Sequence, residues 1–118
     1  MATTGTALGS ENESSESETI LKVTIEVDAN LQVQSVSPDA FEISKSKHQQ
    51  IVWQASDPKA KFNIEFNEDS PFDYTQFSNI EPYSGLVRRE VLGDPGKYYK
   101  YTVRTLNKSI DPGGIVNA

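Results

Sequence analysis

The chain contains no cysteine, only one histidine and only one methionine, which is Met1. A disulfide, a thiolate nucleophile and a cysteine-based metal site are therefore excluded. No stretch has the roughly 20 apolar residues that a membrane-spanning helix needs. The first residues, MATTGTALGS, have neither the basic nor the apolar region of a signal peptide. A soluble cytoplasmic protein is the default expectation, and a mature secreted or periplasmic form would look the same.

Basic residues are also few, with 11 Lys and Arg against 17 Asp and Glu and a net charge of -6. The first 18 residues contain Glu11, Glu13, Glu16 and Glu18 and no Lys or Arg, so the rest of the chain is close to neutral. Binding to nucleic acid or to anionic membranes requires clustered Lys and Arg. We therefore predict neither kind of partner.

At 118 residues the chain has room for one ordinary domain. Residues 1–19 are mostly Thr, Ser, Gly and Glu, a composition that cannot bury enough apolar surface to offset the entropy of ordering. We predict a disordered acidic tail over 1–19 and one domain over 20–118. Serines among glutamates, such as Ser14 and Ser17, suit acidophilic kinases, whereas a solubilising leader is the simpler interpretation.

From Ile20 onward, short runs of apolar residues alternate with polar ones, which is typical of half-buried strands. Turn signals such as GDPG, from Gly93 to Gly96, separate the runs, and no window has helical spacing with caps. The runs lie at about 20–27, 31–36, 41–43, 51–53, 62–66, 86–92, 97–103 and 113–117. This pattern predicts an all-β fold, a single antiparallel β-sandwich.

Several segments occur in the order found in cupredoxins, the Greek-key copper proteins. SPDAFEISKSKHQQIVWQAS resembles a Pro-led strand, a turn and a Trp-bearing strand of that family. KFNIEF resembles the family's His-Asn-Val-x-Phe, with Asn63, Ile64 and Phe66 matching. GKYYKYTV resembles Gly-x-Tyr-x-Tyr-x-Cys, with Tyr99 and Tyr101 matching, and DPGGIVN resembles the closing strand. The resemblance covers about 20–117 and implies a cupredoxin-like Greek-key sandwich.

At the positions where that family has its copper ligands, this chain has other residues. Phe62 stands where the first ligand His would be, and Val103, or Thr102, stands in place of the Cys. A blue-copper site needs two imidazoles and a thiolate, which this chain does not have. We therefore predict no cofactor and no electron transfer through copper. Phe62 and Val103 are expected to fill the former ligand positions with hydrocarbon.

The remaining polar residues offer little for catalysis or metal binding. His48 is expected in a solvated turn. Glu68, Asp69 and Asp73 offer oxygens for Ca²⁺, but their spacing fits no EF-hand loop. Neither a Gly-x-Ser-x-Gly elbow nor a P-loop is present. We predict that the protein is not an enzyme.

The segment Asn67 to Gly85 breaks the alternation and contains four aromatic residues, Phe72, Tyr74, Phe77 and Tyr83. A long loop of this kind either caps the core or forms a recognition patch. Of Arg88 and Arg89, one is expected to point toward the loop or the core and to need a carboxylate or carbonyl partner. Tyr98 shares a strand face with Lys100, Thr102 and Arg104, and this face is either a binding surface or solvated.

The functional prediction is a metal-free binding or protein-interaction module for an unknown protein or small ligand, with the four loop aromatics, Arg88, Arg89 and Tyr98 as candidate contacts. One alternative is a structural or accessory domain that assembles through a sheet edge or the Tyr98 face. A metal-binding protein or hydrolase is the other. The expected state is a monomer or a weak oligomer.

Overall fold

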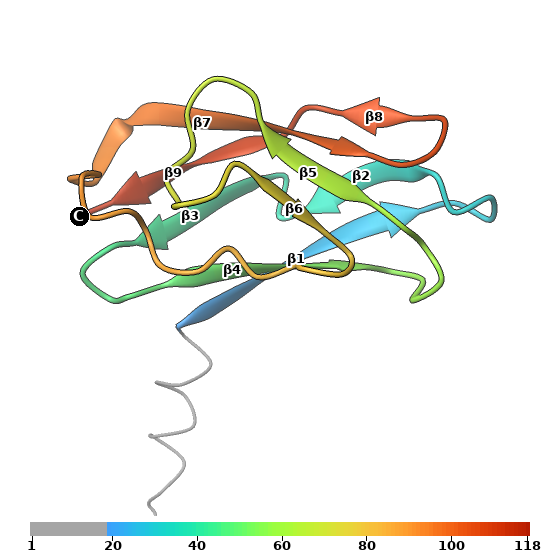
Figure 1. The fold of residues 1–118 in the computed structure, drawn as a ribbon, viewed down its shortest axis with the longest axis horizontal. Helices are drawn as coiled ribbons and strands as arrows, with labels where there is room; N and C mark the ends of the chain where they lie inside the picture. The colour runs from blue at the N-terminus through green and yellow to red at the C-terminus, as the bar shows by residue number, and fades with distance from the viewer. Residues whose placement is uncertain (1–18) are drawn as a thin grey trace, which may run out of the picture.

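A computed structural model describes residues 19–118, which form an all-β domain without a helix (Figure 1). The predicted disordered tail lies outside the described residues except for Thr19. The strands are β1 (Ile20–Val27), β2 (Val33–Ser37), β3 (Ala40–Ser44), β4 (Gln50–Ala55), β5 (Asn63–Phe66), β6 (Gln76–Ser78), β7 (Asp94–Arg104), β8 (Ser109–Ile110) and β9 (Gly113–Asn117). Residues 19–118 also contain no helix of the length and apolar character needed to cross a bilayer.

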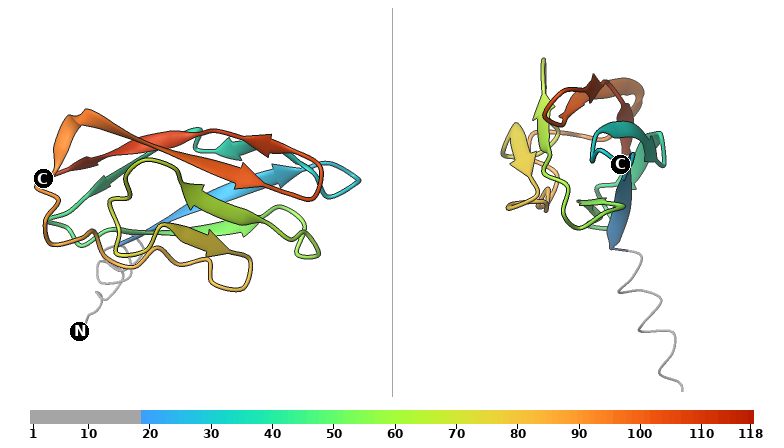
Figure 2. Two further views of the ribbon diagram at one scale, coloured as in Figure 1. Left: turned by 45° about the horizontal axis from the view of Figure 1, so that its top comes forward. Right: turned by 90° about the vertical axis from the view of Figure 1, so that its right-hand side faces the viewer.

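The strands form two sheets that face each other, an arrangement consistent with a β-sandwich (Figure 2). The smaller sheet has the order β2-β1-β4, and the larger one has the order β3-β9-β7-β5-β6, with β8 paired to β7. The expectation of purely antiparallel sheets is wrong, because β1 pairs with β4 and β3 pairs with β9 in parallel. The chain leaves the smaller sheet after β2, forms β3 in the larger sheet and returns as β4, which therefore runs in the direction of β1.

The predicted alternation is present in the strands that form the core. Val23 and Ile25 of β1 and Ile51 and Trp53 of β4 are buried, whereas Lys22 is exposed. The larger sheet contributes most of the rings. Phe66 lies at the centre of the core, with ring centroids 5.2–6.5 Å from those of the following five aromatic residues: Phe41, Trp53, Phe72, Phe77 and Tyr101. Edge-to-face and tilted ring pairs at these distances add to the stability gained from burial.

The strand expected over residues 86–92 is absent. The only bridge of this segment is the isolated one between Val87 and Phe72, which lies in the β5–β6 loop, and the segment turns where the Val91 amide donates to the Arg88 carbonyl. Gly85 and Gly93 have φ angles of +76° and +86°, which non-glycine residues rarely adopt. A segment bounded by two such bends follows the surface rather than a sheet, and this explains why its apolar alternation does not form a strand.

The segment that precedes it covers the free edge of β4. The Trp53 amide donates to the Pro82 carbonyl over 3.0 Å, and the Ser84 amide donates to the Ile51 carbonyl over 2.8 Å. The Ser84 Oγ also accepts from the Ile51 amide. Unpaired strand edges invite association with other chains. Since these backbone groups of β4 are already bonded within the chain, assembly through this edge is disfavoured.

Candidate functional site

Four chain reversals meet at one end of the sandwich, on the right in Figure 1. They are the β1–β2 turn, the β4–β5 loop, the turn after β6 and the β7–β8 turn. Between them lies a groove of about 730 Å³, a size typical of ligand sites. We call it the end groove, and its lining residues are Asn30, Leu31, Gln32, Lys59, Lys61, Phe62, Asn63, Asn79, Arg104, Thr105 and Leu106.

One wall of the end groove is held together by the side chains of Gln32 and Thr105. The Gln32 Oε1 accepts from the Thr105 hydroxyl over 3.0 Å and from the Asn107 amide over 2.8 Å. The Thr105 Oγ1 accepts from the Val33 amide over 3.1 Å. These bonds join the β1–β2 turn to the β7–β8 turn, so the two turns form one rigid wall.

The opposite wall is held by Asn79 and Phe62. The Phe62 amide donates to the Asn79 Oδ1, and the Asn79 amide donates to the Phe62 carbonyl, each over 3.2 Å. Within the β4–β5 loop, Asp57 accepts from the Lys59 amide through Oδ1 and from the Ala60 amide through its carbonyl. The groove is therefore preorganised on both sides, with the buried Phe62 ring between them.

Leu31 lies in the groove with an unusual backbone conformation. Its φ angle is +62°, in the left-handed region that costs a non-glycine L-residue about 1–2 kcal/mol. The Asp28 side chain stabilises the turn, because its Oδ1 accepts from the amides of Asn30 and Gln32 over 2.8 and 3.0 Å. Strained backbone of this kind is concentrated at binding sites.

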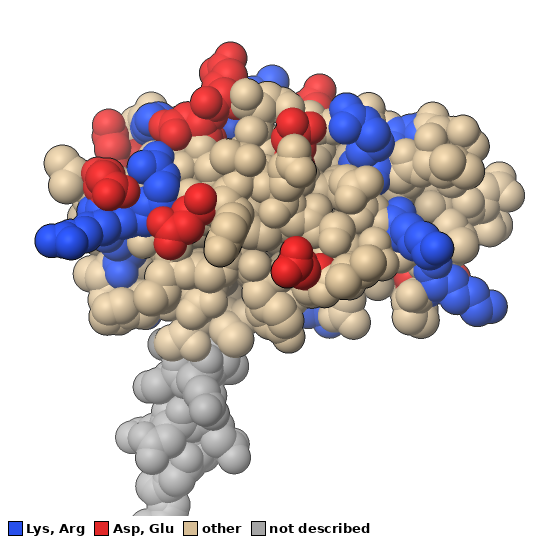
Figure 3. Space-filling view, in the orientation of Figure 1, with Lys and Arg blue, Asp and Glu red and all other residues tan. Residues whose placement is uncertain are grey.

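The charge of the end groove is of one sign. Lys59, Lys61 and Arg104 line it, and no acidic residue does. The nearest ionic partner of Arg104 is Glu65, 3.9 Å away, and no ion pair joins Lys59 or Lys61 to an acid in residues 19–118. Figure 3 shows basic side chains at this end of the molecule, whereas at its left end basic and acidic side chains lie together.

Exposed aliphatic side chains accompany these charges. Leu106, at the tip of the β7–β8 turn, is 88% exposed, and Ile80, next to the lining residue Asn79, is 83% exposed. Both side chains lie at turns, and neither is part of the buried core. They give the end groove an apolar rim beside its cationic lining.

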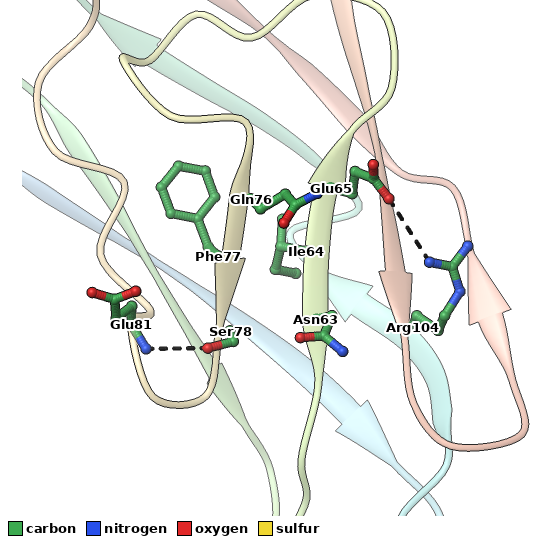
Figure 4. Close-up of a pocket in the computed structure, with 8 residues that line it drawn as sticks. All are labelled: Asn63, Ile64, Glu65, Gln76, Phe77, Ser78, Glu81 and Arg104. Carbon is green, nitrogen blue, oxygen red and sulfur yellow. Dashed lines mark hydrogen bonds and ion pairs between the residues drawn. The ribbon is translucent and has the colours of Figure 1, made fainter.

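Two smaller depressions adjoin the end groove. The first, of about 410 Å³, crosses the outer face of β5, β6 and β7, shares Asn63 and Arg104 with the end groove, and contains Glu65 and Glu81 (Figure 4). The second, of about 350 Å³, lies beside β4 and shares Phe62 and Asn79 with it. The end groove thus continues into both depressions. Of the two, only the depression over β5, β6 and β7 has acidic residues near Arg104.

The loop aromatics divide between the core and the surface. Phe72 and Phe77 are buried and pack against Phe66. Tyr74 is 71% exposed and Tyr83 is 63% exposed. Tyr83 lines the depression beside β4. The loop therefore caps the core with two rings and presents two others to solvent, from different parts of the surface.

The two adjacent arginines have different surroundings, although the strand whose alternating faces led to that expectation is absent. The Arg88 guanidinium donates through Nε to the Ser70 carbonyl over 2.8 Å and through Nη2 to Asp69 over 3.1 Å, whereas Arg89 is exposed. Lys97 also binds Asp69, over 2.6 Å. Arg88 thus fixes the β5–β6 loop, and its charge is already paired.

The Tyr98 face is only partly open. Tyr98, Lys100 and Arg104 are exposed, but Thr102 is buried, since its hydroxyl donates to Asp111 and accepts from Asn67 over 2.7 Å each. The Tyr98 ring lies directly over Gly113, where a Cβ atom would clash with it. These contacts interrupt the row of side chains that the alternation predicted.

The candidate metal ligands do not converge. His48 is exposed in the turn between β3 and β4, as expected. Within residues 19–118 no group of three or more His, Asp or Glu side chains is arranged to hold a metal ion. Phe62 is buried at the end groove, and Val103 lies in the core opposite Ile64 and Ile110.

Asp69 provides a test of how the β5–β6 loop is held. The hydrogen bond from Lys97 lowers the pKa of Asp69 most, the charges of Lys97 and Arg88 add to this, and burial opposes it. Replacing Asp69 with Asn is expected to lower the free energy of unfolding at pH 7 by about 0.2–1 kcal/mol, as for exposed ion pairs. Because the pKa is depressed in the folded state, this contribution is present above the ordinary carboxyl pKa of 3.8 and is lost as the pH falls below it. Urea unfolding at pH 7 and pH 3 measures this contribution. The control is Glu26→Gln, because Glu26 on β1 is exposed and takes part in none of the ion pairs within residues 19–118. An equal loss of stability in Asp69→Asn at both pH values would contradict the prediction.

Comparison with protein-family models, with curated protein sequences and with solved structures gives no match for this chain. The end groove itself was not predicted from the sequence. Its signal is the segment DPKAKF, in which Lys59 and Lys61 flank the buried Ala60 and therefore both point outward. The contribution of Arg104 and Leu106 depends on how distant turns meet, and local sequence does not reveal that.

Proposed function

We propose that this domain is a metal-free binding module whose end groove takes an acidic segment of a partner protein. The observation that carries the proposal is the charge of the groove, with Lys59, Lys61 and Arg104 in the lining and no acid, in a chain whose net charge is -6. Clustering cations in an acidic protein costs self-repulsion, which a complementary anionic ligand relieves.

The apolar rim narrows the kind of segment that fits. A ligand with an apolar side chain next to its carboxylates would bury Leu106 and Leu31 while its charges meet the lysines. Rigid walls reduce the ordering cost that binding has to overcome. The hydrogen bonds of Gln32, Thr105 and Asn79 provide such walls, and the backbone strain at Leu31 is of the kind that binding sites retain.

We also propose that the sandwich is a copperless Greek key of the cupredoxin kind. The sequence order of the KFNIEF, GKYYKYTV and DPGGIVN segments supports this, as does their placement on β5, β7 and β9, which are neighbours in the larger sheet. The family's electron transfer does not come with the fold, since the chain has no cysteine and one histidine.

A fluorescent acidic peptide tests the proposed function. The acetylated peptide Leu-Gly-Glu-Asp-Glu-Glu is expected to bind the full chain, and the peptide Leu-Gly-Gln-Asn-Gln-Gln is not. Combining Lys59→Gln with Lys61→Gln is expected to weaken binding about 2- to 30-fold, since each exposed charge pair contributes about 0.2–1 kcal/mol. Fluorescence anisotropy at low and high salt measures this, and added salt is expected to weaken binding.

The matched control removes the same charge elsewhere. Lys22 on β1 and Lys47 in the β3–β4 turn are exposed and lie outside the end groove. Their combined replacement by Gln is expected to leave peptide affinity nearly unchanged. Equal weakening by both double variants would mean that the peptide responds to net charge alone and would overturn the proposal.

A further inference from the structure

We propose that the end groove recognises a phosphorylated side chain in its acidic partner segment, and that Arg104 distinguishes the phosphate from a carboxylate. This inference rests on the function proposed above and names the chemical class of the partner. Three features of the groove support it: the placement of its cations, the unused hydrogen-bond donors around them and the weak ion pair of Arg104.

Two of the three cations lie on one face of the larger sheet. Asn63 on β5 is paired directly with Arg104 on β7. Lys61 precedes Asn63 by two residues, and burial alternates over residues 60–64, so both side chains point to the same outward face. Diagonal neighbours on antiparallel strands lie about 7–8 Å apart, within reach of long side chains. Lys61 and Arg104 are therefore placed to bind one anion together.

The side chains around this position offer hydrogen-bond donors that are not yet used. The Arg104 guanidinium donates to no acceptor within residues 19–118, and neither do the Nδ2 groups of Asn63 and Asn79. No carboxylate lines the groove. A phosphorylated side chain carries nearly two negative charges and three strong acceptor oxygens, whereas a carboxylate has one charge and two oxygens. Two cations and several free donors at one place therefore suit a phosphate better than a carboxylate.

The present ionic partner of Arg104 is weakly bound. Glu65 follows Asn63 by two residues on β5, and its Oε1 lies 3.9 Å from the Arg104 Nη1, too far for a hydrogen bond (Figure 4). The two side chains are 43% and 56% exposed, and exposed ion pairs contribute little. A phosphate accepts two parallel hydrogen bonds from a guanidinium. It is therefore expected to replace Glu65 as the partner of Arg104, and Glu65 is expected to oppose its binding.

Two acetylated peptides of nearly equal net charge test this inference. Leu-Gly-pSer-Asp-Gln-Glu carries part of its charge on a phosphate, whereas Leu-Gly-Glu-Asp-Glu-Glu carries its charge on carboxylates only. We expect the phosphopeptide to bind the full chain about 3- to 30-fold more tightly at pH 7.5, because the phosphate adds about one to three charge-assisted hydrogen bonds. Fluorescence anisotropy measures both affinities. Equal affinity of the two peptides would overturn the inference.

The variant Arg104→Lys separates recognition by the guanidinium from recognition of charge. Lysine keeps the positive charge but lacks the paired donors of arginine. In this variant the advantage of the phosphopeptide is expected to fall below about 2-fold, while the affinity of the carboxylate peptide changes little. A variant that kept the full advantage would contradict the role assigned to Arg104.

The variant Glu65→Gln tests the competition for Arg104. Removing this acid is expected to tighten binding of the phosphopeptide about 2- to 5-fold, the range typical of one exposed charge pair. The matched control is Glu68→Gln, which removes the same charge from an exposed position in the β5–β6 loop, outside the end groove. Equal tightening by both variants would mean that affinity follows net charge, and it would refute the competition.

Inorganic phosphate separates a phosphorylated segment from a free ion. The phosphopeptide is expected to bind at least about tenfold more tightly than inorganic phosphate, measured by competition, because its leucine and its carboxylates also contact the groove. Equal affinity would make the groove a site for the ion alone and would overturn the inference.

The outcomes also distinguish this inference from the function on which it rests. If both peptides bind equally and the double variant of Lys59 and Lys61 weakens both, the preference for phosphate is refuted and the binding of acidic segments stands. If neither peptide binds the native chain, the proposed function fails and the inference fails with it.

Discussion

Replacing Phe66 with Ala is expected to lower the free energy of unfolding by about 3–5 kcal/mol, the cost typical of removing a buried phenylalanine ring. Phe66 is 3% exposed and contacts rings from both sheets, including Trp53 of β4 and Tyr101 of β7. It also contacts Phe72 and Phe77, which cap the core. Its removal leaves a cavity that rigid neighbouring rings cannot fill.

Urea unfolding followed by tryptophan fluorescence measures this effect, because Trp53 is the single tryptophan of the chain and lies against Phe66. Tyr74→Ala is the control, since Tyr74 is exposed and its loss is expected to change stability by no more than about 0.5 kcal/mol. A cost for Phe66→Ala that is no larger than that of Tyr74→Ala would contradict the packing described for the core.

Raising the pH from 9 to 12 is expected to remove about 2 kcal/mol of stability through Tyr101 alone. Burial raises the pKa of Tyr101 from 10.0 to about 12, because the phenolate is poorly solvated in the core, while the nearby Trp53 indole opposes the shift. The Trp53 Nε1 has no hydrogen-bond partner of normal geometry within residues 19–118, and burial outweighs its effect on the pKa of Tyr101.

The loss of stability with rising pH follows from the linkage between protonation and folding. A pKa that is higher in the folded than in the unfolded state means that the folded state keeps its proton longer, so this contribution is complete below pH 10 and is lost as the pH rises toward 12. A tenfold change in the acid dissociation constant corresponds to about 1.4 kcal/mol. The difference in unfolding free energy between the native chain and Tyr101→Phe, measured at pH 9 and pH 12, isolates this residue. A difference that does not change with pH would contradict it.

The sequence predicted the β-strands well where one face is buried, because alternation directly reflects burial. Val23 and Ile25, and likewise Ile51 and Trp53, lie inside as their spacing indicated. Strand direction was predicted less well. Whether β4 lies beside β1 in parallel or antiparallel depends on the excursion of the chain through β3, and short-range patterns do not carry that information. The segment 86–92 alternates too, but it runs between two glycines with positive φ angles and pairs only at Val87.

The candidate site was predicted only in part for a related reason. The loop aromatics were recognised from composition, yet burial separates them, since Phe72 and Phe77 pack inside and Tyr74 and Tyr83 lie outside. The end groove is formed by turns that are distant in sequence. Gln32 and Thr105, separated by 73 residues, hold one of its walls. Only the pair Lys59 and Lys61 leaves a local signal.

NMR titration of the full chain with Leu-Gly-Glu-Asp-Glu-Glu locates the bound peptide and so tests whether the end groove is the binding site. We expect the amide signals that shift to belong to residues 30–32, 59–63, 79–80 and 104–107, which surround the end groove. The signals of the β3–β4 turn and of residues 88–97 are expected to stay in place. Shifts confined to those regions, or to the outer face around Glu65 and Gln76, would contradict the assignment of the end groove as the binding site.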